Sequence, residues 1–207
     1  MTSNFSVVIP TMWLSNKTPC LLTELDNSSL INEIILIDNN PEKITCNISK
    51  FKKVNHVKNK NNIFVNPSWN LGVQLCKNTN IIITNDDLCI ENIDRVLREI
   101  LNHDYDLIGL DYKNLNKNSE VSVKNKIGSM EKGFGCFFYI KKEKYIIIDN
   151  EIKIWYGDLI LHNLIKNKGI ISFNRIDIEL SKTVKNTTNL TNILTKDKHV
   201  YETKYKN

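Results

Sequence analysis

The chain has 207 residues, of which 41% are hydrophobic and 25% are charged, so one globular domain with a sizeable core is expected. Its formal net charge of +5 comes from lysines spread along the chain, which argues against a nucleic-acid partner, since nucleic-acid modules cluster basic and aromatic residues. No apolar stretch reaches the ~18 residues of a membrane span, and residues 1–6 lack the features of a secretion signal, so a cytoplasmic protein that is not secreted is expected.

The five cysteines are scattered and odd in number, and no two of them form a C-x-x-C pair. This pattern is typical of an intracellular protein and offers no zinc site. We therefore expect reduced thiols at all five positions, which are Cys20, Cys46, Cys76, Cys89 and Cys136.

The first part of the chain predicts the start of a parallel sheet. Phe5–Ile9 and Glu33–Ile37 are short apolar runs typical of buried strands, and leucines at 21, 22 and 25 give one face of a short helix between them. Strand, helix and strand in this order make a βαβ unit with a right-handed crossover. Residues 54–57 are a weaker candidate for a third strand.

A second unit begins at Asn66, which fits a helix N-cap, with Pro67 at the first helical position. Ile81–Ile83 then predict a strand that is buried on both faces and lead directly into Asn85, Asp86 and Asp87. Ligands bind at the carboxyl ends of strands in open α/β sheets, and adjacent carboxylates there suit a hard divalent cation that also binds a diphosphate. A solvated turn with a helix N-cap is the alternative interpretation.

The apolar residues between 93 and 101 recur at steps of three and four, which predicts an amphipathic helix with an Asp94–Arg98 pair on its polar side. A helix is expected after residues 155–158, ending near Gly169. The chain is polar and basic from 181 onward, and residues 190–194 can form one helical turn that docks on the domain. Further strands are expected at 106–110, at 133–140 with glycines at the start, and at 170–173.

Three polar clusters follow three of the predicted strands, namely Pro10–Thr11, Asp38–Asn39 and Asn85–Asp87. If these strands are parallel, all three clusters lie at one edge of the sheet. A carboxylate on the second strand can accept hydrogen bonds from a base or ribose, and carboxylates on the third can hold a metal on the phosphates, so a nucleotide-diphosphate site is expected. The sequence has neither G-x-G-x-x-G nor a Walker loop, so dinucleotide oxidoreductases and P-loop enzymes lack support.

These segments resemble the nucleotide-sugar glycosyltransferases of GT-A fold, family-two type, and the short chain resembles the compact glycosyltransferases of large algal (chlorella-type) viruses. The resemblance implies a single α/β domain over 1–185, with a central, mostly parallel, mixed sheet flanked by helices, and a polar tail over 186–207. A viral member would act in the host cytoplasm. The matching segments are 7–11, 35–39, 66–72, 84–87, 133–139 and 157–158, in the order of the family.

The resemblance also implies a reaction: transfer of a sugar, with inversion, from a nucleotide diphosphate sugar to a hydroxyl of a glycan or glycoprotein. A UDP-sugar is the first expectation for the donor, and Mn²⁺ or Mg²⁺ for the cofactor. Asp87 is the expected metal ligand, and residues 178–181 lack the late His that often joins it in the family. The expected nucleotide contacts are Pro10, Thr11, Asp38, Asn39, Asn70, Asn85 and Asp86.

Asp158 matches the family's catalytic base. An inverting transfer needs one base to take the proton of the acceptor hydroxyl, and a metal on the leaving diphosphate removes the need for a general acid. The alternative is that Asp158 only caps a helix after Gly157. The expected contacts to sugar or acceptor are Gly135, Trp155, Tyr156 and Gly157, although core packing would explain the two aromatic residues as well.

Two other functions share parts of this pattern. A sugar-nucleotide nucleotidyltransferase would use the same metal carboxylates, but it should have a glycine-rich basic loop after the first strand, and residues 10–20 contain no glycine. A non-catalytic nucleotide-sugar-binding domain could keep the fold and lose the base, and the presence of Asp158 argues against it.

Overall fold

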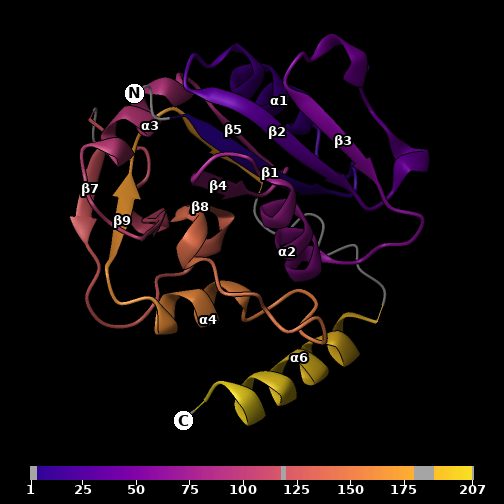
Figure 1. The fold of residues 1–207 in the computed structure, drawn as a ribbon, viewed down its shortest axis with the longest axis vertical. Coiled ribbons are helices and arrows are strands. Elements are labelled where there is room, and N and C mark those ends of the chain that lie inside the picture. The colour runs from indigo at the N-terminus through magenta and orange to yellow at the C-terminus, as the bar shows by residue number, and fades with distance from the viewer. Residues whose placement is uncertain (1–3, 118–119, 180–188, 207) are drawn as a thin grey trace.

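The computed structural model describes residues 4–117, 120–179 and 189–206. Within these residues the strands form an eight-stranded sheet and a separate two-stranded ribbon (Figure 1). The ribbon pairs β5 (Leu88–Ile90) with β10 (Ile176–Ile178) in antiparallel fashion. The strands of the large sheet are β1 (Phe5–Thr11), β2 (Ile31–Asp38), β3 (Val54–Lys58), β4 (Asn80–Thr84), β6 (Leu107–Leu110), β7 (Ser122–Asn125), β8 (Phe137–Lys141) and β9 (Lys168–Ser172).

The strand order of the large sheet is β3-β2-β1-β4-β8-β6-β9-β7. β3, β2, β1 and β4 run parallel to one another, and β6 runs parallel to β9. β8 is antiparallel to both β4 and β6, and β7 is antiparallel to β9. The α/β domain with a mostly parallel, mixed sheet that the sequence predicts is therefore confirmed.

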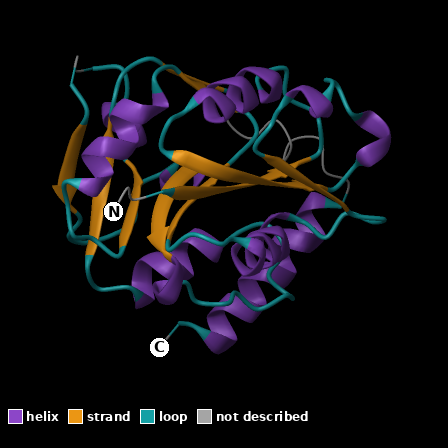
Figure 2. Cartoon of the chain, turned by 45° about the horizontal axis from the view of Figure 1, so that its top comes forward, coloured by secondary structure: helices purple, strands orange, loops and turns teal. Residues whose placement is uncertain are grey.

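Helices cover both faces of this sheet (Figure 2). α1 (Thr18–Asn27) and α3 (Ile93–Leu101) pack on one face, whereas α2 (Val65–Leu75) and α4 (Gly157–Leu164) pack on the other. Every residue of β1 is buried as a result, and so is β4 apart from its first residue. Burial on both faces explains why these strands are continuous apolar runs in the sequence instead of alternating with polar residues.

α3 has the amphipathic pattern that the sequence predicts. Asp94 and Arg98 lie 3.7 Å apart on its solvent side. Leu101, which the pattern also places on the apolar face, is 37% exposed because the helix ends there. The side chains that α3 buries against the sheet are Ile93, Val96, Leu97 and Ile100.

α2 begins at Val65, two residues before the expected position, so Asn66 is not its N-cap. Phe64 holds the N-cap position, with a positive φ of 68°, and Pro67 lies inside the first turn. The side chain of Asn66 points elsewhere: its Nδ2 donates to the carbonyl oxygens of Ile152 and Trp155. A long-range contact therefore replaces the local capping role that the sequence suggested.

The glycines of the 133–140 stretch lie before the strand and not in it. Phe134–Cys136 form a 3-10 turn, and β8 begins only at Phe137. Gly133 has a φ of 79°, a conformation that glycine adopts without strain. Gly169, expected to end a helix, lies inside β9.

A C-terminal helix, α6 (Leu190–Lys204), extends well beyond the single turn expected at 190–194. Figure 1 shows this helix in yellow, below α4 and next to the C-terminus of the chain. The expected domain boundary at 185–186 lies outside the described residues. No helix in the described part of the chain combines the length and the apolar character that a membrane crossing needs.

Candidate functional site

The parallel strands β1, β2 and β4 bring the three predicted polar clusters together. Thr11 lies opposite Asp38 in the register of β1 and β2, and the amide of Asn39 donates to the carbonyl oxygen of Thr11 at 2.9 Å. Thr11 Oγ1 also donates to Asp86 Oδ2 at 2.6 Å. We call this group the strand-end cluster; it consists of Thr11, Asp38, Asn39, Asn85, Asp86 and Asp87.

The two adjacent carboxylates of this cluster are both buried and face different neighbours. Burial raises the pKa of Asp86, while hydrogen bonds from Thr11 and from the backbone of Met12 lower it. Asp86 is therefore bound to the end of β1. Asp87 lies close enough to Cys136 that its charge helps to raise the pKa of that thiol. The two carboxylates thus have different neighbours, and the division in which Asp86 faces the nucleotide and Asp87 the metal stays a prediction.

Asp38, the expected contact to the base, is fully buried and already has partners. Its Oδ2 lies 2.8 Å from His56 Nε2, and its Oδ1 accepts the amide hydrogen of Asn40 at 2.9 Å. The ring of Trp13 lies edge-on to His56, with 6.3 Å between ring centres. His56 is thus a candidate site residue, by its contact with Asp38, that the sequence did not indicate, and its position on the predicted third strand was the available signal.

Asn39 and Asn70, both expected at the nucleotide, lie in different surroundings. Asn39 Nδ2 donates to Ser68 Oγ at 3.0 Å, so Asn39 connects the end of β2 to α2. Asn70 instead donates to the carbonyl oxygen of Ile148 at 2.7 Å and accepts the hydroxyl hydrogen of Tyr145 at 2.9 Å. The structure therefore uses Asn70 to fasten the 145–150 segment to α2 and does not bring it into the strand-end cluster. Pro10 is buried within β1.

A second group, which we call the turn cluster, consists of Gly135, Cys136 and residues 155–158. A Cβ atom on Gly135 would lie 2.6 Å from Asp158 Oδ2, so only glycine lets the two residues approach this closely. The amide of Asn85 donates to the carbonyl oxygen of Cys136 at 2.9 Å, which joins the two clusters. Burial first, and then the charges of Asp87 and Asp158, raise the pKa of the Cys136 thiol to about 12.

Asp158 is the second residue of α4 and does not occupy the N-cap position, which Tyr156 holds. Burial raises the pKa of its carboxyl group, and hydrogen bonds from the backbone of Leu159, Asp158 and Gly135 lower it. A buried carboxylate with a raised pKa, close to a second carboxylate, is a candidate for acid–base chemistry.

The other residues expected at the sugar or acceptor directly precede Asp158 in the chain, and each contacts α2 or α6. Tyr156 stacks on Tyr201 of α6, with 4.7 Å between ring centres. A Cβ atom on Gly157 would lie 2.1 Å from Asn66 Oδ1, so packing against α2 is sufficient to explain this glycine. Trp155 is half-buried and donates its amide hydrogen to Asp197 of α6.

The donor set partly fits the expected divalent cation. Among the described residues, no three His, Cys, Asp or Glu side chains form a group that could hold a metal by themselves. Mg²⁺ is often bound by one or two carboxylates together with substrate phosphates, and Asp86 and Asp87 provide such oxygens. Glu179 lies beside them, because its amide donates to the carbonyl oxygen of Asp87 at 2.7 Å. The two carboxylates therefore suit a cation that is shared with a diphosphate, and the cation itself stays a prediction.

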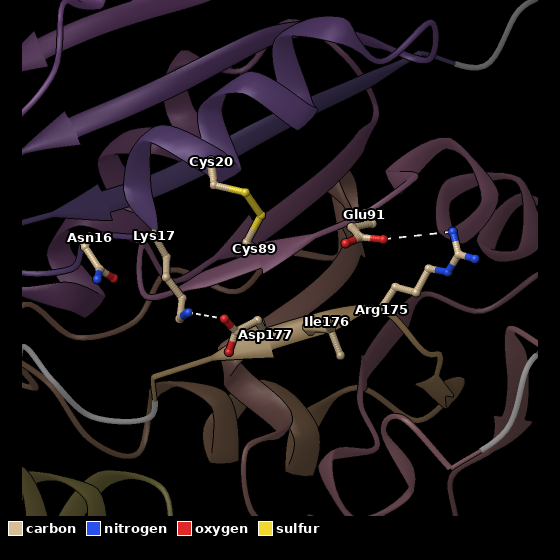
Figure 3. Close-up of a pocket in the computed structure, with 8 residues that line it drawn as sticks. All are labelled: Asn16, Lys17, Cys20, Cys89, Glu91, Arg175, Ile176 and Asp177. Atoms are coloured by element: carbon tan, nitrogen blue, oxygen red, sulfur yellow. Dashed lines mark hydrogen bonds and ion pairs between the residues drawn. A yellow bond between two sulfur atoms is a disulfide. The ribbon is translucent and has the colours of Figure 1, made fainter.

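The expectation of five reduced thiols is wrong for two of them, because a disulfide joins Cys20 of α1 to Cys89 of β5 (Figure 3). Their Cα atoms lie 5.8 Å apart, within the usual range for a disulfide. The cysteines are 69 residues apart in the chain, and only the packing of α1 on β5 brings them together, so their spacing gave no signal. Reduced cysteines were one argument for an intracellular protein, and the disulfide removes that argument.

The disulfide lines an open cavity of about 490 Å³. Two ion pairs border this cavity in Figure 3, Lys17 with Asp177, and Arg175 with Glu91 at 3.9 Å. Cys89 is the middle residue of β5 and lies two residues after Asp87, so the disulfide joins α1 to the strand that follows the strand-end cluster in the chain.

No known family model and no curated protein sequence matches this chain. Solved structures of S. aureus TarS do match in three dimensions. TarS 1–349 in complex with UDP has a TM-score of 0.61 at 11% identity, covering 98% of this chain and 72% of that chain. TarS 1–349 in complex with UDP-GlcNAc has a TM-score of 0.58 at 11% identity, covering 97% and 73%. At this identity the likeness shows the fold alone, and it confirms that the chain has the predicted α/β fold of GT-A type.

Proposed function

We propose that this chain transfers a sugar, with inversion, from a nucleotide diphosphate sugar to a hydroxyl of a glycan or glycoprotein acceptor. One observation supports this most: the segment that carries Asp87 and the turn beside Asp158, far apart in the sequence, are in contact, because the amide of Asn85 donates to the carbonyl oxygen of Cys136 at 2.9 Å and Gly135 packs directly against Asp158. An inverting transfer needs charge stabilisation at the leaving diphosphate and one base at the acceptor. The strand-end and turn clusters offer these two groups side by side.

In this proposal the strand-end cluster binds the donor. The Asp38–His56 pair faces the base, and Asp86, bound to Thr11, faces the ribose. A divalent cation held by Asp87, Mn²⁺ or Mg²⁺, would stabilise the negative charge that develops on the diphosphate. UDP is the first expectation for the nucleotide, because TarS, whose fold this chain shares, was crystallised with UDP and with UDP-GlcNAc.

The turn cluster would perform the proton transfer. Asp158 takes the proton of the acceptor hydroxyl while that oxygen forms a bond to the anomeric carbon and the bond to the diphosphate breaks. Attack from the face opposite the leaving group inverts the anomeric configuration. The raised pKa of Asp158 increases its basicity toward the acceptor proton. Trp155 and Tyr156 lie beside Asp158 in the chain and are the proposed contacts to the acceptor.

The direct test incubates the protein with Mn²⁺, a panel of UDP-sugars and simple glycoside acceptors. We expect UDP release together with a new glycoside, whose anomeric proton in NMR spectra shows a configuration opposite to that of the donor. A protein that instead forms a nucleotide sugar from a nucleoside triphosphate and a sugar phosphate would be a nucleotidyltransferase. Binding of UDP, seen as a rise in melting temperature, without any turnover would indicate a non-catalytic binding domain.

A further inference from the structure

The chain segment that leads into Asp158 has no regular secondary structure. Residues 149–156 form turns and bends and then enter α4 at Gly157. Backbone N–H groups in such a segment need partners from outside it. Asp197 of α6 supplies three of them: its Oδ1 accepts the amide hydrogen of Lys153 at 2.8 Å, and its Oδ2 accepts those of Ile154 at 2.8 Å and Trp155 at 3.0 Å.

Asn66 of α2 holds the same segment from the other side. Its Nδ2 donates to the carbonyl oxygens of Ile152 at 3.3 Å and Trp155 at 3.0 Å, and its amide donates to the carbonyl oxygen of Lys153 at 3.0 Å. The carbonyl groups of the segment are thus bound by α2 and its amides by α6. Both contacts end immediately before the turn at Tyr156, from which α4 and Asp158 follow.

Asp197 stands out on its own helix. It is fully buried, whereas the rest of α6 is half-buried or exposed. A buried carboxylate is tolerated only when hydrogen bonds compensate for the lost hydration, and three charge-assisted bonds do so here. Two further contacts attach α6 to the segment: Tyr201 stacks on Tyr156, and Lys204 pairs with Glu151 at 3.1 Å.

We propose that Asp197 is a positioning residue for the reaction: by binding the amides of residues 153–155 it sets the place of Asp158. This proposal rests on the proposed function of Asp158 as the base. Tyr156 has a φ of 66°, which is unfavourable for a residue other than glycine, so the turn into α4 needs restraint from outside. Without Asp197 the segment relaxes, and a misplacement of about 1 Å at the base can cost ~10²-fold in rate.

Two substitutions of Asp197 test this. Asp197→Asn keeps one oxygen for two of the amides and loses the third bond, so we expect turnover to fall about tenfold. Asp197→Ala removes all three bonds, and we expect a fall of ~10²-fold. In both variants the affinity for UDP should stay at the wild-type value, because the strand-end cluster is untouched. Lys198→Gln is the control, since Lys198 is the neighbour of Asp197 on the same helix and its side chain is exposed; it should behave as wild type.

Amide hydrogen exchange gives a readout that does not depend on activity. Exchange at residues 153–155 should accelerate in both Asp197 variants, while exchange in β1 and β4 should not change. Unchanged exchange at these amides, or full turnover despite faster exchange, would overturn the proposal. A parallel loss of UDP affinity would do the same, because it would indicate general loosening of the fold. If Asp197→Ala does not fold, Asp197→Asn decides the question.

Failure of the proposed function can be told apart from failure of this proposal. In that case the wild-type protein would transfer no sugar, while amide exchange would still report the contact between Asp197 and residues 153–155.

Discussion

The strand-end cluster and the turn cluster touch each other but are held in place differently. The first lies on a regular parallel sheet, where neighbouring strands hold its side chains, as in the Thr11–Asp86 and Asp38–His56 contacts. The second lies on a 3-10 turn and on the irregular approach to α4, and it depends on residues distant in the chain, such as Asn66 and Asp197. We infer that donor binding should resist distant substitutions, whereas turnover should be sensitive to them.

The largest effect is expected from Asp158→Asn, which removes the proton acceptor and keeps the size of the side chain. Turnover should fall by ~10²–10⁴-fold, the usual contribution of a positioned base. The affinity for the nucleotide should not change, because Asp158 belongs to the turn cluster. Initial rates of transfer, measured beside calorimetric titration with UDP, check both statements. Loss of UDP affinity together with turnover would move Asp158 into the donor site.

Asp87→Asn should produce the opposite pattern. Loss of a charged contact to the cation is expected to weaken donor binding in the presence of Mn²⁺ by ~10²-fold, with the fold intact. Asp177→Asn is a suitable control, because Asp177 is an exposed carboxylate on β10 that pairs with Lys17. If calorimetry shows that Asp87→Asn binds UDP and Mn²⁺ as wild type does, the assignment of the metal ligand is wrong.

The pH dependence of turnover, measured at saturating donor, should report the ionisation of Asp158. Asp158 acts as a base only when ionised, and its pKa is raised above the ordinary value of 3.8. Turnover should therefore decline as pH falls through this raised pKa, by about tenfold per pH unit on the acid side, while UDP binding follows a different profile. The stability of the fold should change in the opposite direction. Above pH 3.8 the folded state holds the proton of Asp158 more tightly than the unfolded state does, so the contribution of this group to the free energy of unfolding falls as pH rises through the raised pKa. An acid limb that persists in Asp158→Asn would contradict the assignment.

The smallest effect on activity is expected from removal of the disulfide. Cys20→Ser combined with Cys89→Ser should lower the free energy of unfolding by about 2–5 kcal/mol, because the unfolded chain is no longer cross-linked. Turnover at temperatures below the transition should not change, since neither cysteine belongs to either cluster. Cys20 is exposed, so a reductant should reproduce the shift in the denaturation midpoint of the wild-type protein. Loss of UDP binding in a folded variant would show that the disulfide shapes the strand-end cluster.

The strand-end cluster could be predicted from the sequence because each of its residues directly follows an apolar run that marks a buried strand. The apolar run Ile81–Ile83 is continuous since both faces of β4 are covered, and the polar residues that follow it must lie at the strand's end. The same reasoning found β1 and β2, and with them the common edge of the sheet.

The residues that the sequence analysis misassigned or missed are those whose roles depend on tertiary contacts. Asn66 resembles an N-cap but binds the segment before α4, and Asn70 binds the 145–150 segment. Asp197 lies in a polar stretch and becomes buried only because α6 packs beside that segment. The pairing of Cys20 with Cys89 likewise depends on how α1 packs on β5. None of these contacts has a periodicity or a spacing that marks it in one sequence.

The most direct test of the division between the clusters is an NMR titration of isotope-labelled protein with UDP and Mg²⁺. We expect the amide signals of Thr11, Asn39 and Asn85 to shift, while those of Trp155 and Leu159 stay in place. Replacing Mg²⁺ with Mn²⁺ should broaden the signals around Asp87 most strongly. Shifts confined to the turn cluster, or no shifts at either cluster at saturating UDP, would contradict the central claim that the strand ends bind the donor.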